Sequence, residues 1–478
     1  MNNLRFSIYT LGCKTNQSES DCIASDLISR GCQIVSLKEK PDFSIINTCT
    51  VTSASDSKAR QLIRRIKQSN PSGKIIVTGC FVVFNEKFLA ENKIDFIIRN
   101  EDKNNIPKLV YNIFNVNFTG KAGKLDKSDK TVKVGETGAF SEIFPSPAPA
   151  MPYQNIHSRA LVKIQDGCEQ DCSYCIVPSV RGCYKSTQPD LIVDTIINLV
   201  SNGFEEIVIT GIHIGKYGVD FGQNYNLASL LKIILDSTTV KRIRLSSIEI
   251  NEINQELLEI VKKSNGRVAR HFHIPLQSGS TKILKLMNRR YTREYFIDAI
   301  KSIKSIEKKL DGIAITTDII VGFPGESDAD FIETLEMAKN VGFSKIHVFK
   351  FSSRTNTPAA LMEGQISEIV KSNRSHIARK LGEELRDRYI RSNLNNELEV
   401  LCEEIDPESG LYSGTSGNYI KVYFKIKPDQ LPPELAEAGA TLFTKNQQDS
   451  VFEMVKGKLL KIKAKELYRG GLKGDPST

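Results

Sequence analysis

The apolar positions of the first hundred residues form short continuous runs separated by stretches with helical spacing. The helical stretches are 17–29, where Ile23, Leu27 and Ile28 share one face, and 55–69, which stops at Asn70-Pro71. The apolar runs predict four strands, at 5–13, 43–49, 74–80 and 95–100. Strands that alternate with helices in this way predict a parallel α/β layer.

The middle of the chain repeats this strand–helix rhythm over a longer distance, with helical segments of about 10 to 20 residues between the runs. Its six predicted strands are 160–165, 205–214, 241–249, 271–278, 313–323 and 344–351. Six such units predict a partial (β/α)6 barrel, and the functional site of such a barrel lies at the carboxyl ends of its strands.

The last part of the chain changes character after a long charged helix at 369–393. The segments ELEVLCEEI, SGLYSGTSGNYIKVYFKI and VFEMVKGKLLKIKAKEL are β-rich and are separated by Gly/Ser turns, which predicts a small all-β barrel. The lysine-rich 121–133 and the proline-rich 146–152 are unsuited to a core and mark a linker. The predicted divisions are 3–118, linker 119–153, 154–386, 387–462 and a basic tail at 463–478.

Composition narrows the class of protein. The 478 residues are 40% hydrophobic and 25% charged, as in soluble globular proteins. No apolar run reaches the ~18 residues of a membrane span, and the N-terminus lacks a signal-peptide core, so we expect a cytoplasmic protein. Ten cysteines in such a compartment favour metal, cluster or catalytic roles over disulfides. The net charge of +9 is consistent with a polyanionic partner.

Three cysteines occupy equivalent positions in the first region. Cys13, Cys49 and Cys80 each follow a predicted strand, and the carboxyl ends of parallel strands lie on one edge of a sheet. A single buried cysteine is most often a small hydrophobe. Three at three strand ends instead predict that the thiols converge on one site.

A second triplet lies in one loop. Cys168, Cys172 and Cys175 have the spacing C-x3-C-x2-C directly after the first strand of the predicted barrel. Three thiolates can hold three corners of an iron–sulfur cube and leave the fourth iron open to a small molecule. Cys183 is a candidate fourth ligand for zinc. Structural zinc sites usually have two C-x2-C-type pairs of ligands, however, and no second pair follows here. The barrel context favours the open cluster over zinc and over a closed electron-transfer cluster.

At these residues the chain resembles radical S-adenosylmethionine enzymes, and more narrowly the methylthiotransferases. Their N-terminal domain is similar to LGCKTNQSES, INTCTVTSAS and VTGC of this sequence. Their barrel is similar to IQDGCEQDCSYCIVP, TGIHIGKYG, RLSSIE, HIPLQSGS, MNRRYT and DIIVGFPGE, and their RNA-binding TRAM domain to the C-terminal β region. The resemblance covers nearly the whole chain.

The resemblance implies two [4Fe-4S] clusters and S-adenosylmethionine as cofactors. Cys168, Cys172 and Cys175 would hold the radical-generating cluster, and Cys13, Cys49 and Cys80 an auxiliary cluster that binds or carries sulfur. One S-adenosylmethionine supplies a methyl group, and another supplies the 5′-deoxyadenosyl radical that abstracts hydrogen from adenine C2. Such a C–H bond offers nothing to acid–base catalysis, so the cofactor must carry the chemistry. A flavodoxin- or ferredoxin-like electron donor and a sulfur source are the expected partners, beside tRNA.

Within the family, KIQDGC, NTCTVT, TGIHIG and SSIE favour the subgroup that modifies N6-threonylcarbamoyladenosine at tRNA position 37. The alternatives are the branch acting on isopentenyladenosine in tRNA and the branch acting on an aspartate of a ribosomal protein. A non-catalytic, metal-stapled RNA-binding protein is the alternative from another class. The sequence departs from the family pattern at Phe81-Val82-Val83, at Cys183 to Ser186 and at Ile250, none of which is a predicted cluster ligand.

Other residues have weaker signals. Those predicted to line the S-adenosylmethionine pocket are Gly211, Ser247, Glu249, Gln277 and Gly322, although rim glycines also serve tight turns. Those predicted to contact RNA are Arg64, Arg65, Arg181, Tyr419 and Lys421. His213 and His273 are expected to be polar rim residues rather than metal ligands. The remaining cysteines, Cys22, Cys32, Cys183 and Cys402, are expected to be plain thiols.

Overall fold

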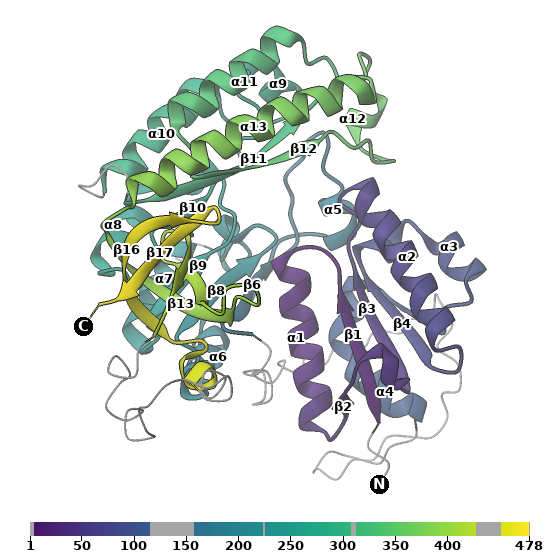
Figure 1. The fold of residues 1–478 in the computed structure, drawn as a ribbon. Coiled ribbons are helices and arrows are strands. Elements are labelled where there is room, and N and C mark those ends of the chain that lie inside the picture. The colour runs from purple at the N-terminus through teal and green to yellow at the C-terminus, as the bar shows by residue number, and fades with distance from the viewer. Residues whose placement is uncertain (1–3, 115–156, 223–224, 307–311, 427–450, 478) are drawn as a thin grey trace. The chain divides into compact units, whose positions relative to one another are not determined.

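The computed structural model describes residues 4–114, 157–222, 225–306, 312–426 and 451–477. The chain divides into two compact units (Figure 1). The first is Met1–Tyr153 together with Ser179–Arg181, and the second is Gln154–Pro178 together with Gly182–Thr478. The predicted linker 119–153 lies outside the described residues.

The first unit is a five-stranded parallel sheet in the order β2-β1-β3-β4-β5. The central strand β3 is buried at all six positions, which explains its continuous apolar run. Helices α1 and α4 pack on one face of the sheet, and α2 and α3 pack on the other. The strands are β1 (Arg5–Thr10), β2 (Gln33–Ile34), β3 (Phe43–Thr48), β4 (Lys74–Gly79) and β5 (Phe96–Ile98). The helices are α1 (Lys14–Ser29), α2 (Ser53–Ser69), α3 (Glu86–Glu91) and α4 (Ile106–Phe114).

The second unit begins with six parallel strands that follow one another in chain order. Two sheets contain them, β7-β6-β8-β9 and β10-β11-β12, and an isolated bridge between Ser247 and His273 connects β9 to β10. The predicted partial (β/α)6 barrel is therefore confirmed. The strands are β6 (Ala160–Asp166), β7 (Lys185–Ser186, antiparallel to β6), β8 (Glu206–Gly211), β9 (Arg242–Leu245), β10 (His271–His273), β11 (Ala314–Val321) and β12 (Lys345–Lys350).

Helices cover the outside of this barrel, and their apolar faces join the strands in one large core. Several begin at side-chain caps, for example Ser327 and Thr292, whose hydroxyls accept backbone N–H groups of the first turn. The helices are α5 (Val177–Arg181), α6 (Pro189–Ser201), α7 (Leu227–Ser237), α8 (Gln255–Lys263), α9 (Thr281–Leu286), α10 (Arg293–Ser305), α11 (Asp328–Val341), α12 (Pro358–Leu361) and α13 (Glu368–Ser392). None of the described helices is long and apolar enough to cross a membrane.

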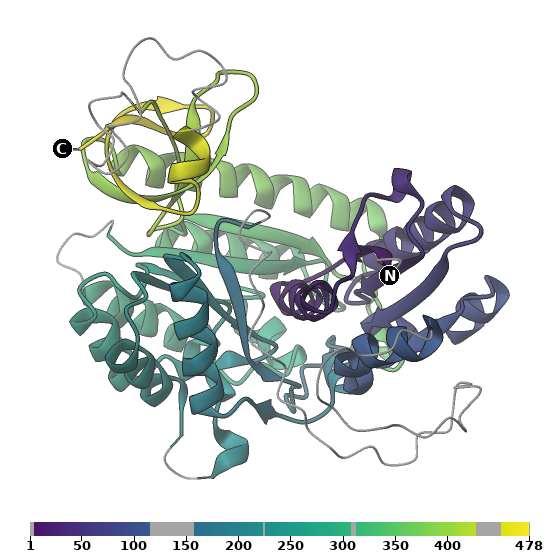
Figure 2. The same cartoon turned by 90° about the horizontal axis from the view of Figure 1, so that it is seen from below.

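The C-terminal strands form a closed barrel in the order β13-β14-β15-β17-β16, as predicted for this region (Figure 2). They are β13 (Glu397–Ile405), β14 (Tyr412–Ser416), β15 (Lys421–Phe424), β16 (Leu459–Tyr468) and β17 (Gly471–Pro476). The structure differs from the sequence prediction at the end of the chain. Residues 463–476, predicted as a basic tail, form most of β16 and all of β17 and close the barrel. The predicted boundary at 386/387 lies inside α13.

Within the second unit, the turn between β14 and β15 lies against the amino ends of the core strands. Tyr419, at φ +69° in this turn, stacks on His271, the first residue of β10, with ring centroids 4.5 Å apart. The guanidinium of Arg244 lies over the Tyr419 ring, 4.9 Å from the ring centroid. Tyr419 therefore fastens the small barrel to the core.

A buried charge cluster strengthens the same junction. Glu206, the first residue of β8, accepts hydrogen bonds from Arg242 and Arg244 of β9, and all three side chains are 0–1% exposed. The two arginines also donate to backbone carbonyls of the small barrel, Arg242 to Glu399 at 2.9 Å and Arg244 to Ser416 at 3.0 Å. One core carboxylate therefore neutralises guanidiniums that bond to the small barrel.

A third guanidinium completes this cluster. Arg159 pairs with Glu206 at 3.2 Å and also with Glu403 of β13. Burial alone would raise the pKa of Glu206, but Arg244, Arg242 and Arg159 outweigh it and lower the pKa to about 2. Glu206 is therefore ionised at neutral pH.

Candidate active site

The loop that follows β6 carries the C-x3-C-x2-C triplet. Its first turn requires Gly167, at φ +72°, because a Cβ there would lie 1.8 Å from the backbone oxygen of Cys183. The amide of Cys168 donates to the oxygen of Gly182, and the amide of Cys175 donates to the oxygen of Cys172. The loop is thus folded by its own backbone.

Burial acts on two of the three thiols. It raises the pKa of Cys175 to about 12, and the neighbouring Cys172 and Cys168 sulfurs add to the effect. Burial also raises the pKa of Cys172, although Arg289 opposes the change. The three sulfurs therefore influence one another electrostatically. Desolvated thiols ionise when a cationic centre binds them, so the donor set fits a metal cluster.

Two side chains from other elements bond to the sulfurs. The guanidinium of Arg289 donates to the sulfur of Cys172 at 3.4 Å and also pairs with Glu249. The Nδ1 atom of His213 lies 3.4 Å from the sulfur of Cys168, and its Nε2 atom lies 2.8 Å from Glu252. Glu249 and His213 follow β9 and β8, so three strand ends meet at the triplet.

The pKa values of His213 and Glu249 are set by burial and by close charged partners. Burial would lower the pKa of His213, but Cys168 and Glu252 raise it to about 9. Burial raises the pKa of Glu249, and Arg289 opposes that change. From the sequence, Arg289 was only part of the motif MNRRYT and had no predicted role, and His213 was expected to be a polar rim residue. No local pattern connects either residue to a cysteine more than 40 positions away.

The second triplet lies in the first unit, at the carboxyl ends of β1, β3 and β4. Burial raises the pKa of Cys49, and the sulfurs of Cys80 and Cys13 raise it further, so the three thiols interact electrostatically at the strand ends. Gly12, at φ +119°, leaves room for Cys49, since a Cβ there would lie 2.7 Å from the Cβ of that cysteine. Asn16 accepts from the Cys13 thiol, and Asn100 donates to the Cys80 sulfur, both at 3.8 Å.

Among the described residues, no three His, Cys, Asp or Glu side chains are placed to hold a single metal ion. In an iron–sulfur cube each thiolate binds a different iron, so its ligands stand farther apart than those of one zinc ion.

The residues predicted to line the S-adenosylmethionine pocket all follow core strands at their carboxyl ends. Gly211 ends β8, and Ser247 forms the bridge to His273 after β9. Gln277, at φ +63°, follows β10, and Gly322 follows β11 and donates its N–H to Glu326 at 2.6 Å. Of these five residues, Glu249 is the one connected to the triplet by hydrogen bonds, because Arg289 donates both to Glu249 and to the Cys172 sulfur.

The residues predicted to contact RNA differ in accessibility. Arg64 and Arg65 are exposed on α2, and Lys421 is 41% exposed beside Glu404. The Arg181 side chain is 1% exposed because it pairs with Glu19 and Asn16, which leaves it no surface for RNA. Tyr419 stacks on His271, so its ring is committed to the junction with the core.

Comparison with known proteins agrees with this architecture. Residues 162–338 match the model of the radical SAM superfamily, and residues 5–98 match that of the uncharacterized protein family UPF0004. The threonylcarbamoyladenosine tRNA methylthiotransferase MtaB of Bacillus subtilis is 37% identical over 433 residues, 89% of this chain and 91% of the relative. The chain belongs to the radical S-adenosylmethionine methylthiotransferase family.

Further relatives carry two different names. MtaB of Thermotoga maritima is 35% identical, covering 87% of this chain and 90% of its own. The tRNA-2-methylthio-N(6)-dimethylallyladenosine synthase of Pelotomaculum thermopropionicum is 33% identical, covering 88% and 91%. The radical S-adenosylmethionine methyltransferase TsrM of Kitasatospora setae shares the fold, with a TM-score of 0.51 at 13% identity over 76% of this chain and 74% of its own.

Membership confirms the expectation of an enzyme that uses S-adenosylmethionine and iron–sulfur clusters. S-Adenosylmethionine and iron–sulfur chemistry supply the radical when bound. The chain supplies the frame: the loop after β6 presents Cys168, Cys172 and Cys175, Arg289 and His213 bond to two of their sulfurs, and the carboxyl edge of the barrel surrounds them.

Proposed function

We propose that this methylthiotransferase acts on tRNA and converts N6-threonylcarbamoyladenosine at position 37 to its 2-methylthio derivative. The observation that carries the proposal is that relatives named for threonylcarbamoyladenosine reach 37% identity over most of the chain, whereas those named for dimethylallyladenosine reach 33–34%. The closed C-terminal barrel supports an RNA substrate, because small barrels of this kind bind oligonucleotides. A tRNA substrate also implies the cytoplasm.

The two cysteine triplets have separate roles in this proposal. Cys168, Cys172 and Cys175 hold the radical-generating [4Fe-4S] cluster, whose open iron binds S-adenosylmethionine. Cys13, Cys49 and Cys80 hold the auxiliary [4Fe-4S] cluster, where sulfur is received. The reaction also requires an electron donor, flavodoxin- or ferredoxin-like, and a sulfur source. Gly211, Ser247, Glu249, Gln277 and Gly322 line the S-adenosylmethionine pocket, and Arg64, Arg65 and Lys421 are the exposed RNA contacts.

Mass spectrometry of tRNA nucleosides tests the substrate. Deletion of the gene is expected to abolish 2-methylthio-N6-threonylcarbamoyladenosine, and the wild-type gene is expected to restore it. Loss of the dimethylallyl derivative instead would move the protein to the alternative branch. Unchanged tRNA together with a changed ribosomal protein would overturn the proposal.

Iron analysis tests the ligands. Anaerobic reconstitution is expected to give about eight irons per chain, from two four-iron clusters. Replacing Cys168, Cys172 and Cys175 by Ala should leave about four. The matched control is Cys183→Ala, because Cys183 is exposed beside the same loop and is not a proposed ligand. Zinc in place of iron, or equal iron in the triple variant and the wild type, would contradict the assignment.

A further inference from the structure

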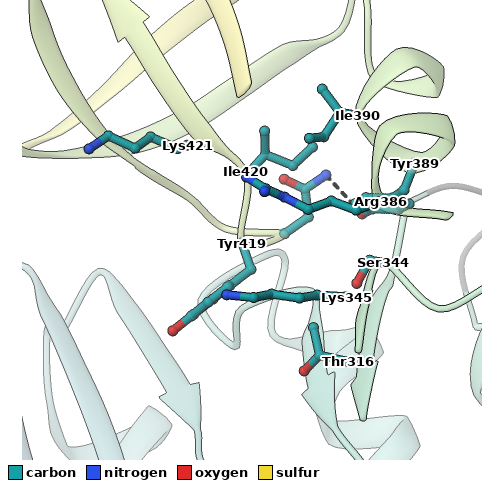
Figure 3. Close-up of a pocket in the computed structure, with 10 residues that line it drawn as sticks. Thr316, Ser344, Lys345, Arg386, Tyr389, Ile390, Tyr419, Ile420 and Lys421 are labelled. Atoms are coloured by element: carbon teal, nitrogen blue, oxygen red, sulfur yellow. Dashed lines mark hydrogen bonds between the residues drawn. The ribbon is translucent and has the colours of Figure 1, made fainter. Parts of the chain in front are cut away.

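A small, solvent-open hollow lies in the second unit between the small barrel and the core (Figure 3). Its floor is the amino end of β12 and the facing part of β11, its wall is α13, and its roof is the turn between β14 and β15. The lining residues are Thr316, Ser344, Lys345, Arg386, Tyr389, Ile390, Asn418, Tyr419, Ile420 and Lys421. Three of the ten are basic and none is acidic.

The three basic side chains of this hollow differ in whether they have a partner. Lys421 pairs with Glu404 at 2.6 Å, and Arg386 donates to the carbonyl oxygen of Gly470, also at 2.6 Å. Lys345 makes no hydrogen bond or ion pair with any described residue. Burial lowers the pKa of Lys345, and the guanidinium of Arg386 lowers it further. Two half-buried cations of the same sign therefore face one cavity without a carboxylate between them, an arrangement that an anion would stabilise.

The walls of the hollow are held by contacts that do not use Lys345. The side-chain amide of Asn418 donates to the Tyr389 hydroxyl at 3.1 Å and to Asn393 at 2.8 Å, which ties the turn to α13. Tyr419 is fixed by its stacking on His271. Lys345 therefore lines a cavity whose walls are held by other contacts.

We propose that this hollow binds a phosphate group of the RNA backbone, with Lys345 and Arg386 as its cationic partners. The inference rests on the proposed function, because tRNA is the polyanionic substrate of that proposal. Lysine and arginine side chains are the usual phosphate contacts in protein–nucleic acid complexes, and such contacts position the nucleic acid without reading its sequence.

The position of the hollow suits this role. Lys345 begins β12 and Phe349 lies four residues later on the same face of that strand, about 13 Å toward the carboxyl edge of the barrel. The Phe349 side chain is 44% exposed and offers an aromatic surface on that path. A phosphate held at Lys345 would anchor the substrate at the end of the core opposite to the cysteine loop.

The test is the salt dependence of tRNA binding by the full-length chain, measured by fluorescence anisotropy with labelled tRNA. Lys345→Gln should reduce the slope of log K against log salt by about 0.7–0.9 and weaken binding about fivefold at 0.15 M salt, the loss of one phosphate contact. Lys345→Gln combined with Arg386→Gln should reduce the slope about twice as much. Lys345→Arg should retain the wild-type slope.

The matched control is Lys380→Gln, which removes an equal charge from an exposed position of α13 outside the hollow. Circular dichroism and iron content establish that each variant is folded. A slope for Lys345→Gln equal to that for Lys380→Gln would overturn the inference. That outcome is distinct from failure of the proposed function, which would appear as tRNA left unmodified by the wild-type gene.

Discussion

Glu206→Gln is expected to loosen the junction between the barrel core and the C-terminal barrel. The substitution keeps the shape of the side chain but removes the carboxylate that bonds to all three of Arg159, Arg242 and Arg244. Lowering the Glu206 pKa from 4.5 to about 2 corresponds to about 3 kcal/mol of folding free energy at neutral pH. Removing one partner from a buried ion pair costs about 3–5 kcal/mol, in agreement.

The assay is urea denaturation of the anaerobic protein at pH 7, followed by far-UV circular dichroism. Glu205→Gln is the matched control, because Glu205 also contacts the small barrel, through the Leu459 amide, but its lysine partners are 62% and 42% exposed. Its loss is expected to stay below about 1 kcal/mol. Equal losses in the two variants, or a loss below about 0.5 kcal/mol for Glu206→Gln, would refute the reasoning.

The same variant predicts a pH dependence. Because folding lowers the Glu206 pKa, its contribution is complete above pH 4.5 and disappears as the pH falls toward 2. The difference between wild type and Glu206→Gln, measured on the metal-free full-length chain, should be constant from pH 7 to 5 and shrink below 4.5. A difference that grows on acidification would contradict the assignment of the charged form.

Two further substitutions test the cysteine loop. Arg289→Met removes the donor to the Cys172 sulfur and should lower the midpoint potential of the cluster in an anaerobic redox titration monitored by electron paramagnetic resonance; an unchanged potential would exclude the contact. Gly167→Ala should distort the loop and reduce iron content, because its Cβ would meet Cys183, whereas Gly266→Ala has a similar positive φ but open space and should retain iron; equal losses would implicate backbone strain alone.

The sequence was sufficient for features that depend on local pattern. The strands that carry the cysteines are long and apolar, so β1, β3, β4 and β6 could be placed to within a few residues. The two-residue β2 was missed, since so short a strand has no periodicity of its own. Where the predicted basic tail begins, lysine alternates with apolar residues (461–465, KIKAK), and the charge obscured a pattern with the period of a strand.

Features that depend on distant partners could not be predicted. Arg242 and Arg244 alternate with apolar residues in β9, as surface charges of a half-exposed strand would, yet both are buried. What allows their burial is Glu206, some 36 residues earlier, and backbone oxygens more than 150 residues later. The predicted RNA contact of Arg181 failed for the same reason. Its partner Glu19 is 162 residues away, so the sequence around Arg181 does not show that the side chain is buried in an ion pair.

The buried cluster around Glu206 also bears on how such proteins can be recombined. A chimaera that joins the C-terminal barrel of one family member to the core of another, with its crossover at residue 386 or 387, would cut α13 in two. It would also leave Arg242 and Arg244 facing carbonyl groups for which they were not selected. The inheritable module is therefore the small barrel together with α13 and the arginine–glutamate cluster, so a graft that exchanges substrate-binding barrels must carry residues from both sides of that junction.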